Sequence, residues 1–477
     1  MEGQDSSEVE QWRIFELKWD VSISGNPFED VSLSAVFEKG NDSIQVKGFY
    51  NGSGSFLIRF SPPSTGEWKY KTESNIKELD QKSGRFMCFP AKEGNHGPVQ
   101  VKDVFSFRYA DGTDFHPFGT TLYAWTHQSD SLRNTTLNTL SQQGFNKVRM
   151  CVFPKDYWWN HNEPEKYPFE GNPSEGFDFK NFNAEFFQDL EEAILELDQL
   201  GIEVDLILFH PYDRWGFSDM GEKVNRSYVK YIISRLSAFK NIWWSLANEY
   251  DFMEDFDLEE WNRLIDLVEQ EDPYGRLRSI HNGTSFYDHS NPKLTHASIQ
   301  SMDLSEIENW RSQYQKPIII DECGYEGDIP WEWGNLSPES MVSAFWEGIV
   351  KGAYVSHGET YLTNIDENKK IEENDDVLWW SKGGTLQGES PERISFLKDF
   401  IEDGSGSKND NDSDYLIYFG SRQPALHLLP LENDRKYEVY VIDTWNMTID
   451  KKDKVYSGHS VVELPGQPYI GLRIVEQ

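Results

Sequence analysis

The feature that most constrains the fold is an alternation of short apolar runs with helical stretches across the middle of the chain, from about residue 103 to 402. Short runs rich in β-branched and aromatic residues predict buried strands, and longer stretches with apolar residues every three or four positions predict helices. Eight strands with intervening helices over about 300 residues favour a (β/α)8 barrel, an α/β fold. The expected strands are 115–122, 147–153, 203–209, 242–247, 277–281, 294–299, 317–321 and 353–357, and expected helices include 185–200, 225–239, 258–270 and 338–350.

The main alternative for this region is a doubly wound parallel sheet. Such folds commonly carry a GxGxxG phosphate-binding turn directly after an early strand. No early strand of this chain is followed by that pattern. We therefore prefer the barrel, spanning residues 103–402.

Both flanks predict β structure. An N-terminal β-sandwich is expected over residues 9–102, where strand-like segments are separated by turn-forming clusters of Gly, Pro, Asn and Ser. A polar segment at 402–413 precedes a C-terminal antiparallel β domain, expected over residues 403–477. The flanking strands expected most clearly are 31–37, 55–60 and 67–72, then 415–419, 437–442 and 460–464.

The charge balance limits the partners. The chain has 45 basic and 81 acidic residues, a formal net charge of −36, which opposes binding to nucleic acid and to anionic membrane surfaces. No apolar run is long enough to span a bilayer. The 17 Trp and 22 Tyr residues suit a carbohydrate cleft, because aromatic rings present flat amphipathic faces. We expect a carbohydrate substrate, no nucleic acid or membrane partner, and leave a homo-oligomer open.

Cysteine usage indicates a reducing compartment. Cys88, Cys151 and Cys323 are widely separated and form no CxxC pair, so neither a disulfide framework nor a zinc motif is expected. Residues 1–11 are polar and acidic and lack the basic and apolar regions of a secretory signal. We expect a cytoplasmic protein with three free thiols, unless a signal peptide has been removed.

Two glutamates follow apolar strands on the side where barrel enzymes place their active sites. Glu249 lies in WSLANEYD after the fourth strand, and Glu322 lies in IIIDECGYEG after the seventh. Strands four and seven lie on opposite sides of an eight-stranded barrel, so the two carboxylates can face each other across its mouth. Glycoside hydrolysis with retention needs such a pair, one protonated and one ionised. Glu249 and Glu322 are therefore the candidate catalytic residues.

Two neighbouring polar residues are candidates for supporting roles. Arg149, on the second strand, is expected to pair with Glu322 and keep its carboxylate ionised, although a purely structural ion pair is the alternative. Asn248, directly before Glu249, is expected to hydrogen-bond the sugar hydroxyl next to the reacting carbon.

Histidines and tryptophans complete the candidate substrate site. His210, His281 and His357 all fall at strand ends, where they either bind sugar hydroxyls, ligate a metal or belong to the core. A metal would require two or three of the rings around one ion. We expect hydroxyl binding, with no metal and no cofactor. Six tryptophans could form stacking platforms for sugar rings, with burial in the core as the alternative: Trp125, Trp158, Trp159, Trp215, Trp379 and Trp380. Of these, Trp159 and Trp380 are the preferred candidates.

These residues give the central region a resemblance to the clan A retaining glycoside hydrolases, and among them to the apiosidase-like barrel families. The resemblance rests on Asn248-Glu249, Glu322, Arg149 and the segment YADGTDFHPFGTTLYAW at 109–125. In that clan the Glu after Asn is the acid/base and the strand-seven Glu is the nucleophile. The resemblance therefore implies these roles for Glu249 and Glu322.

The flanks extend the resemblance to nearly the whole chain. Segments 25–37 and 48–72 resemble the N-terminal β-sandwich of uncharacterised function that is often fused to these barrels. Segments 437–447 and 464–474 resemble the small C-terminal β domain of the same proteins.

The chain departs from the clan at two strands. The sixth strand, around 296–301, lacks the Tyr that many members place against the nucleophile. The eighth strand offers His357 and Glu359 where many members have a Trp. Both differences concern the subsite that holds the reacting sugar.

The sequence thus indicates a retaining O-glycoside hydrolase that acts on plant or microbial oligosaccharides or polysaccharides. One alternative is a catalytically inactive barrel that only binds carbohydrate, which the presence of both Glu249 and Glu322 disfavours. The other is a metal-dependent hydrolase that uses His210, His281 and His357.

Overall fold

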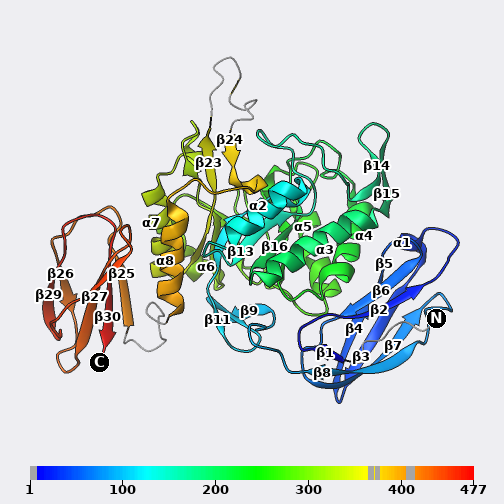
Figure 1. Cartoon of the computed structure of the whole chain (residues 1–477), viewed down its shortest axis with the longest axis horizontal. Coiled ribbons are helices and arrows are strands. Elements are labelled where there is room, and N and C mark those ends of the chain that lie inside the picture. The colour runs from blue at the N-terminus through cyan, green and yellow to red at the C-terminus, as the bar shows by residue number, and fades with distance from the viewer. Residues whose placement is uncertain (1–7, 364–369, 371–376, 404–413) are drawn as a thin grey trace.

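The computed structural model describes residues 8–363, 370, 377–403 and 414–477. Figure 1 shows a barrel in the middle of the molecule, with an N-terminal β-sandwich (blue) and a C-terminal β unit (red) at opposite ends. The expected fold class is confirmed. Most of the expected polar segment at 402–413 lies outside the described residues. None of the helices in the described residues has both the length and the apolar character needed to cross a bilayer.

The central unit is an eight-stranded parallel sheet whose strands follow the order β18-β17-β16-β13-β12-β22-β20-β19. A further parallel bridge between His281 and Ser298 joins the two ends of this order and closes the barrel. All eight expected strands are present. They are β12 (Phe118–Thr121), β13 (Lys147–Cys151), β16 (Glu203–Phe209), β17 (Ile242–Ala247), β18 (Arg278–Ser279), β19 (Ala297–Gln300), β20 (Ile318–Glu322) and β22 (Tyr354–His357).

The first expected strand, 115–122, is divided into two short strands. Pro117 interrupts it, because proline has no N–H for the ladder. The earlier piece joins a small antiparallel sheet that closes the N-terminal end of the barrel, where the Phe107 ring lies 5.4 Å from Trp243 and 5.6 Å from Tyr354. The opposite end, where the strands reach their carboxyl termini, is not covered by this sheet. The small sheet consists of β9 (Val99–Lys102), β10 (Ser106–Tyr109) and β11 (Asp114–Phe115).

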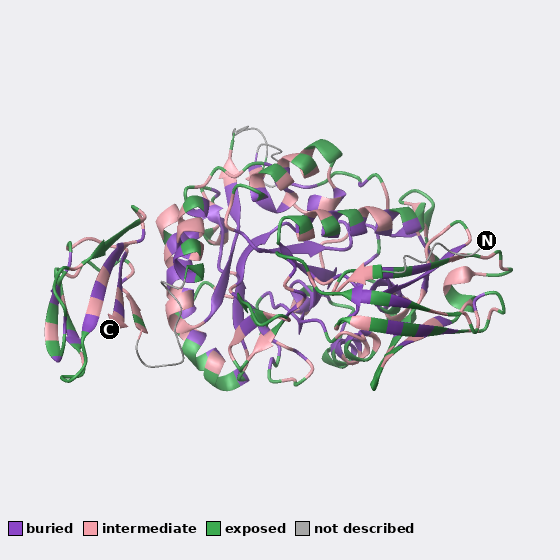
Figure 2. Ribbon diagram, turned by 60° about the horizontal axis from the view of Figure 1, so that its bottom comes forward, coloured by how far each residue is buried: buried purple, intermediate pink, exposed green. Residues whose placement is uncertain are grey.

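Helices surround the barrel and cover the outer faces of its strands. Several of them begin at a side-chain cap, such as Asn183, Asp257 or Ser337, which accepts a hydrogen bond from a backbone N–H of the first turn. Figure 2 shows the barrel strands buried between helices that are exposed on their outer sides. The helices are α2 (Asp130–Leu140), α3 (Ala184–Gln199), α4 (Glu222–Leu236), α5 (Leu258–Glu271), α6 (Ile307–Tyr314), α7 (Pro338–Lys351) and α8 (Ser390–Glu402).

Several short elements interrupt the βα units. A hairpin follows β13, and a three-stranded sheet is built from the segments after β20 and β22. The strands are β14 (Phe169–Asn172), β15 (Gly176–Phe182), β21 (Glu326–Gly327), β23 (Glu359–Leu362) and β24 (Val377–Trp379). Single 3-10 turns are η1 (Trp125–His127), η2 (Tyr250–Phe252), η3 (Leu304–Glu306), η4 (Glu332–Gly334) and η6 (Trp380–Lys382).

The N-terminal unit is a sandwich of a five-stranded and a three-stranded sheet. Its core contains the stacked rings of Phe37 and Phe60, with Trp68 fully buried beside them. All strand pairs are antiparallel except β1 with β8. The elements are β1 (Glu8–Glu10), β2 (Phe15–Asp20), α1 (Pro27–Asp30), β3 (Leu33–Lys39), β4 (Asp42–Lys47), β5 (Phe49–Tyr50), β6 (Ser55–Phe60), β7 (Gly66–Ser74) and β8 (Ser83–Phe89).

A buried arginine attaches this sandwich to the barrel. Arg59 on β6 pairs with Glu191 on α3, with N–O distances of 2.5 and 3.0 Å, and Glu191 also pairs with Arg235 on α4. Bidentate pairs of this kind fix orientation as well as contact. The sandwich is therefore held against α3 and α4.

The C-terminal unit contains a four-stranded sheet and a two-stranded sheet. It packs on the barrel through Tyr418, whose ring stacks on Trp346 of α7 at 5.9 Å. The strands are β25 (Asp414–Tyr418), β26 (Leu426–Pro430), β27 (Tyr437–Asp443), β28 (Thr448–Lys451), β29 (His459–Glu463) and β30 (Ile470–Glu476).

The three cysteines are free, as expected, and all three are buried. Burial raises the pKa of Cys88 to about 11 and the pKa values of Cys151 and Cys323 to about 12. Because the thiolate is the reactive form, we expect almost no reaction with a thiol reagent in the native protein and about three thiols per chain in denaturant without reductant. Titration of about one thiol in denaturant would show a disulfide and contradict this.

Candidate active site

A cavity of about 230 Å³ lies where the barrel strands end. Its walls come from residues at or after the ends of β12, β13, β16, β17, β19 and β20, together with the small sheet β21-β23-β24. The lining residues are Tyr123, Lys155, Tyr157, Tyr212, Glu249, Gln300, Met302, Glu322, Gly324, Tyr325, Trp333 and Trp379. The two candidate carboxylates therefore share one cavity.

Glu249 follows β17 in an uncommon backbone conformation. Its φ of 53° lies in the left-handed region, which costs energy for a residue with a Cβ. Backbone hydrogen bonds on both sides hold it there, from Asn248 N to Phe209 O and from Tyr250 N to His281 O, each 3.0 Å. The neighbouring strands thus fix the direction in which this carboxyl leaves the barrel.

The surroundings of Glu249 favour its protonated form. Burial, reinforced by the negative charge of Glu322, raises the pKa of Glu249 to about 7. The positive charge of Lys155 and hydrogen bonds from Tyr212 and Gln300 act in the opposite direction and limit the rise. A carboxyl with a pKa near neutrality can give up and recover a proton at physiological pH, as a general acid and base must.

Glu322, the last residue of β20, is surrounded by hydroxyl donors. Its Oε1 accepts a hydrogen bond from the Tyr325 hydroxyl at 2.9 Å and another from the Tyr123 hydroxyl. Burial, followed by the charge of Glu322, raises the pKa of both tyrosines well above the usual value, so both remain donors. Two such hydrogen bonds to one oxygen fix the orientation of the carboxyl group.

The two departures at the sixth and eighth strands have a structural counterpart. Many clan members place a Tyr from the sixth strand against the nucleophile. Here Tyr123, after the first strand, and Tyr325, after the seventh, contact Glu322 instead. Gln300 at the end of the sixth strand interacts with Glu249 instead. An aromatic ring also lines the cavity near the eighth strand, supplied by Trp379 on β24.

The expected pairing of Arg149 with Glu322 is wrong. Arg149 Nη1 pairs with Asp321 at 3.0 Å and with Asp205 at 3.4 Å. The reason is strand alternation: Asp321 points into the barrel, where it also pairs with Lys147, and the next residue points into the cavity. Burial opposes the charge, but Lys147 and Arg149 hold the pKa of Asp321 far below its usual range.

Asn248 also differs from expectation. It is fully buried and does not line the cavity. Its Oδ1 accepts from Arg149 Nη2 at 3.2 Å, and its Nδ2 donates to Glu249 Oε2 at 3.1 Å. Arg149 therefore supports the site through Asn248 and Glu249, and Asn248 orients the carboxyl instead of binding a sugar hydroxyl.

The three histidines do not contact the cavity, so their expected role in binding hydroxyls is wrong. His210, His281 and His357 are at most 2% exposed, and none lines the cavity. They do not converge on one ion either. Among the described residues, the one group of three candidate metal ligands contains His357 with Glu326 and Glu359, and neither other histidine.

The tryptophans that line the cavity are not the two that the sequence analysis preferred. Trp380 is fully buried and donates from Nε1 to Thr120 Oγ1 at 2.8 Å. Trp159 is 3% exposed and packs against Trp333, with 6.0 Å between ring centroids. Neither lines the cavity, whereas Trp333 and Trp379 do.

Lys155, which the sequence analysis missed, supplies the positive charge of the cavity. Its ammonium lies 4.0 Å from the ring centroid of Tyr212 and 4.5 Å from that of Tyr123, with Tyr157 and Trp379 farther out. Aromatic faces stabilise a buried cation of this kind. Lys155 is only 4% exposed, so its charge acts at short range on Glu249.

Three protein families match the chain. Residues 102–405 match the family described as apiosidase-like, catalytic domain. Residues 8–75 and 404–475 match two families described as domains of unknown function, DUF5060 and DUF5605. No curated protein matches the chain.

Solved structures are similar over most of the chain. A candidate glycoside hydrolase from Bacteroides vulgatus is 39% identical, with a TM-score of 0.91 over 99% of this chain and 100% of that one. A family 5 glycoside hydrolase from the same species is 16% identical, with a TM-score of 0.61 over 80% and 93% of the two chains. Another glycoside hydrolase is 14% identical, with a TM-score of 0.62 over 80% and 98%. At 16% and 14% identity, the last two similarities show a shared fold only.

Proposed function

Since the chain belongs to the apiosidase-like family and is a glycoside hydrolase, we propose that it cleaves O-glycosidic bonds in plant or microbial oligosaccharides or polysaccharides with retention of anomeric configuration. The observation that carries this proposal is the pair Glu249 and Glu322 on the wall of one cavity. Their surroundings differ: one carboxyl has a pKa raised to about 7, and the other accepts two tyrosine hydroxyls. Such a difference separates an acid from a nucleophile.

In the first step a Glu322 oxygen attacks the anomeric carbon while the proton of Glu249 passes to the departing glycosidic oxygen. The bond from the anomeric carbon to the leaving oxygen breaks, and a glycosyl ester of Glu322 forms. In the second step Glu249 takes a proton from water, and the hydroxide oxygen displaces Glu322 from the anomeric carbon. Two inversions give net retention.

The charge of Glu322 links the two steps. While Glu322 is ionised, its charge helps to raise the pKa of Glu249. Once Glu322 is esterified that charge is gone, so the pKa of Glu249 falls and the same group becomes the base for the second step. One residue can therefore serve as acid and then as base.

The rest of the cavity supports a carbohydrate ligand. Trp333 and Trp379 offer aromatic faces to a sugar ring, and Lys155 and Gln300 offer donors for its hydroxyls. The cavity of about 230 Å³ is below the roughly 300–1,000 Å³ of drug-sized pockets, which supports a subsite for one sugar ring.

Both alternatives have less support. An inactive barrel that only binds carbohydrate would need neither the carboxylate pair nor the uncommon backbone of Glu249. A metal-dependent hydrolase built on His210, His281 and His357 is disfavoured because these rings do not converge and do not line the cavity.

A panel of aryl pyranosides and furanosides tests the reaction, followed by proton NMR of the first sugar released from the best substrate. We expect the anomer of the substrate to appear first and to mutarotate later. The opposite anomer at early times would contradict retention. Sugar binding without hydrolysis of any substrate would favour the inactive barrel.

Tyr325→Phe should lower kcat by about tenfold to a hundredfold, because a hydrogen bond to a charged group contributes about 1.5–3 kcal/mol. The lost hydroxyl donates to Glu322 Oε1 at 2.9 Å. Tyr228→Phe is the matched control, since that hydroxyl donates to the backbone of Leu208 outside the cavity. Equal kcat values for the two variants would contradict a role for Tyr325 in the reaction.

A further inference from the structure

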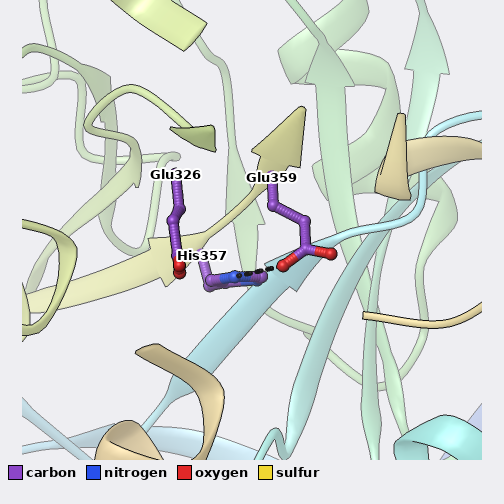
Figure 3. Close-up of side chains that lie close together, drawn as sticks. All are labelled: Glu326, His357 and Glu359. Carbon is purple, nitrogen blue, oxygen red and sulfur yellow. Dashed lines mark ion pairs between the residues drawn. The ribbon is translucent and has the colours of Figure 1, made fainter. Parts of the chain in front are cut away.

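Three buried side chains of metal-ligand type meet outside the cavity. Glu326 on β21, His357 at the end of β22 and Glu359 on β23 each present one ligand atom, and these atoms lie within 4.8 Å of one another. Figure 3 shows the two carboxylates and the imidazole directed toward one another. All three residues are 0% exposed, and His357 Nε2 lies 3.9 Å from Glu359 Oε2.

The hydrogen bonds of His357 define which ring nitrogen carries the proton. Thr120 Oγ1 lies 3.1 Å from His357 Nδ1 and 3.2 Å from the His357 carbonyl oxygen, and it accepts a hydrogen bond from Trp380. A hydroxyl has one proton, so both contacts with His357 are hydrogen bonds only if the hydroxyl donates to the carbonyl and Nδ1–H donates to the hydroxyl. Nε2 of the neutral ring then carries a bare lone pair.

That lone pair has no partner. His357 Nε2 is buried and makes no hydrogen bond within the described residues. It is directed toward Glu359 Oε2, but the 3.9 Å between the two atoms is too long for a hydrogen bond. A buried acceptor of this kind is costly unless a proton or a cation lies between the two groups.

The carboxylates lack a positive partner as well. Across the described part of the chain, no lysine or arginine is within ion-pair distance of Glu326 or Glu359. Backbone amides of Gln387 and Gly388 donate to Glu359, and donors from Tyr361, Glu389 and Ser390 satisfy Glu326. These neutral donors orient the two acids but bring no positive charge to them.

We propose that Glu326, His357 and Glu359 bind one divalent transition-metal ion, with Zn²⁺ the best fit. One imidazole nitrogen with two carboxylate oxygens is a donor set that zinc accepts and that magnesium or calcium sites rarely use. The centre of a triangle with 4.8 Å sides lies about 2.8 Å from each corner, so small side-chain shifts would reach the roughly 2.0–2.2 Å of zinc bonds. Thr120 would hold the ring with Nε2 facing the ion, as partners of ligand histidines do.

The ion would have a structural role. None of the three ligands lines the cavity, so it does not touch the reacting sugar. It would tie β21 to β22, β23 and the start of α8, where Ser390 donates to Glu326. Tyr325, which donates to Glu322, directly precedes Glu326 and would be fixed with it. The proposal does not depend on the glycosidase reaction.

Metal analysis of the purified full chain tests the proposal. We expect about one zinc per chain that survives dialysis against EDTA under native conditions, because the ligands are fully buried. Protein unfolded and refolded with EDTA should then melt several degrees below protein refolded with Zn²⁺. Less than a tenth of an equivalent of zinc, together with equal melting after both treatments, would overturn the proposal.

Variants separate the metal from a shared proton, the other possible occupant. Glu359→Gln should lower the bound zinc at least tenfold and lower the melting temperature, whereas Glu203→Gln, at a buried glutamate on β16, should keep the zinc. A shared proton instead predicts no zinc in the wild-type protein and a Glu359→Gln variant that melts at the same or a higher temperature. If Glu359→Gln does not fold, the refolding comparison on the wild-type chain still decides.

Discussion

Glu322→Ala is expected to abolish hydrolysis, with a loss of kcat of about a thousandfold or more, while the melting temperature changes little. Without the carboxylate no glycosyl ester can form, and the tyrosine hydroxyls of Tyr123 and Tyr325 lose their acceptor. The measurement is kcat on the best aryl glycoside, alongside thermal unfolding. The matched control is Glu332→Ala, which removes an exposed carboxylate next to the cavity residue Trp333.

Added azide or formate should restore turnover in Glu322→Ala. The small anion occupies the space of the lost carboxylate and attacks the anomeric carbon once, so a β-glycoside should give the α-glycosyl product. Restored activity with that inversion would identify the removed group as the nucleophile. More than a tenth of wild-type activity without any added anion would contradict the assignment.

Glu249→Gln is expected to remove the basic limb of the pH profile of kcat/KM. Burial and the charge of Glu322 raise the pKa of Glu249 to about 7, and the protonated form is the active acid. Activity is therefore present below that pH and is lost as the pH rises through it. Because the two carboxylates interact, the limb reports a macroscopic value for the pair.

The same variant should distinguish substrates by leaving group. Poor leaving groups need the proton and should slow by about a hundredfold to ten-thousandfold, whereas activated aryl glycosides should lose much less in glycosylation. In the control Lys155→Met, loss of a positive charge should move the basic limb to higher pH, since Lys155 lowers the pKa of Glu249. Equal losses for both substrate types, with an unchanged basic limb, would show that Glu249 is not the acid.

The barrel could be predicted because its strands are buried on both faces. β17 is expected at 242–247 and is found at Ile242–Ala247, and β16 is likewise found at its expected bounds, Glu203–Phe209. In both strands every residue is buried, so apolar residues occupy most positions of each strand, and only Glu203, Asp205 and Ser245 are polar. The first strand was less predictable because Pro117 divides it.

The carboxylates could be predicted for the same reason: each directly follows an apolar strand. The partner of Arg149 could not be predicted in the same way. Asp321 and Glu322 are adjacent acids, and which of them points into the barrel depends on the exact register of the strand. The tryptophans differ by one residue for the same reason: Trp380 was a preferred platform, but its neighbour Trp379 lines the cavity.

The histidines and tyrosines show a second limit of sequence reasoning. A position at a strand end does not reveal whether later segments will cover it, and His210, His281 and His357 are all covered. Tyr123 and Tyr325 lie within the motifs singled out, but a tyrosine that donates to a carboxylate has no sequence signature. Their place directly after strands one and seven is the signal that could have found them.

The central claim is that Glu322 forms a covalent ester with the sugar, and trapping that ester tests it most directly. A 2-deoxy-2-fluoro glycoside of the preferred sugar with a good leaving group should inactivate the enzyme, because fluorine slows hydrolysis of the intermediate more than its formation. Mass spectrometry of the digested protein should then find one fluoroglycosyl group on the peptide that contains Glu322. Attachment to a different residue, or rapid turnover with inversion and no adduct, would contradict the account.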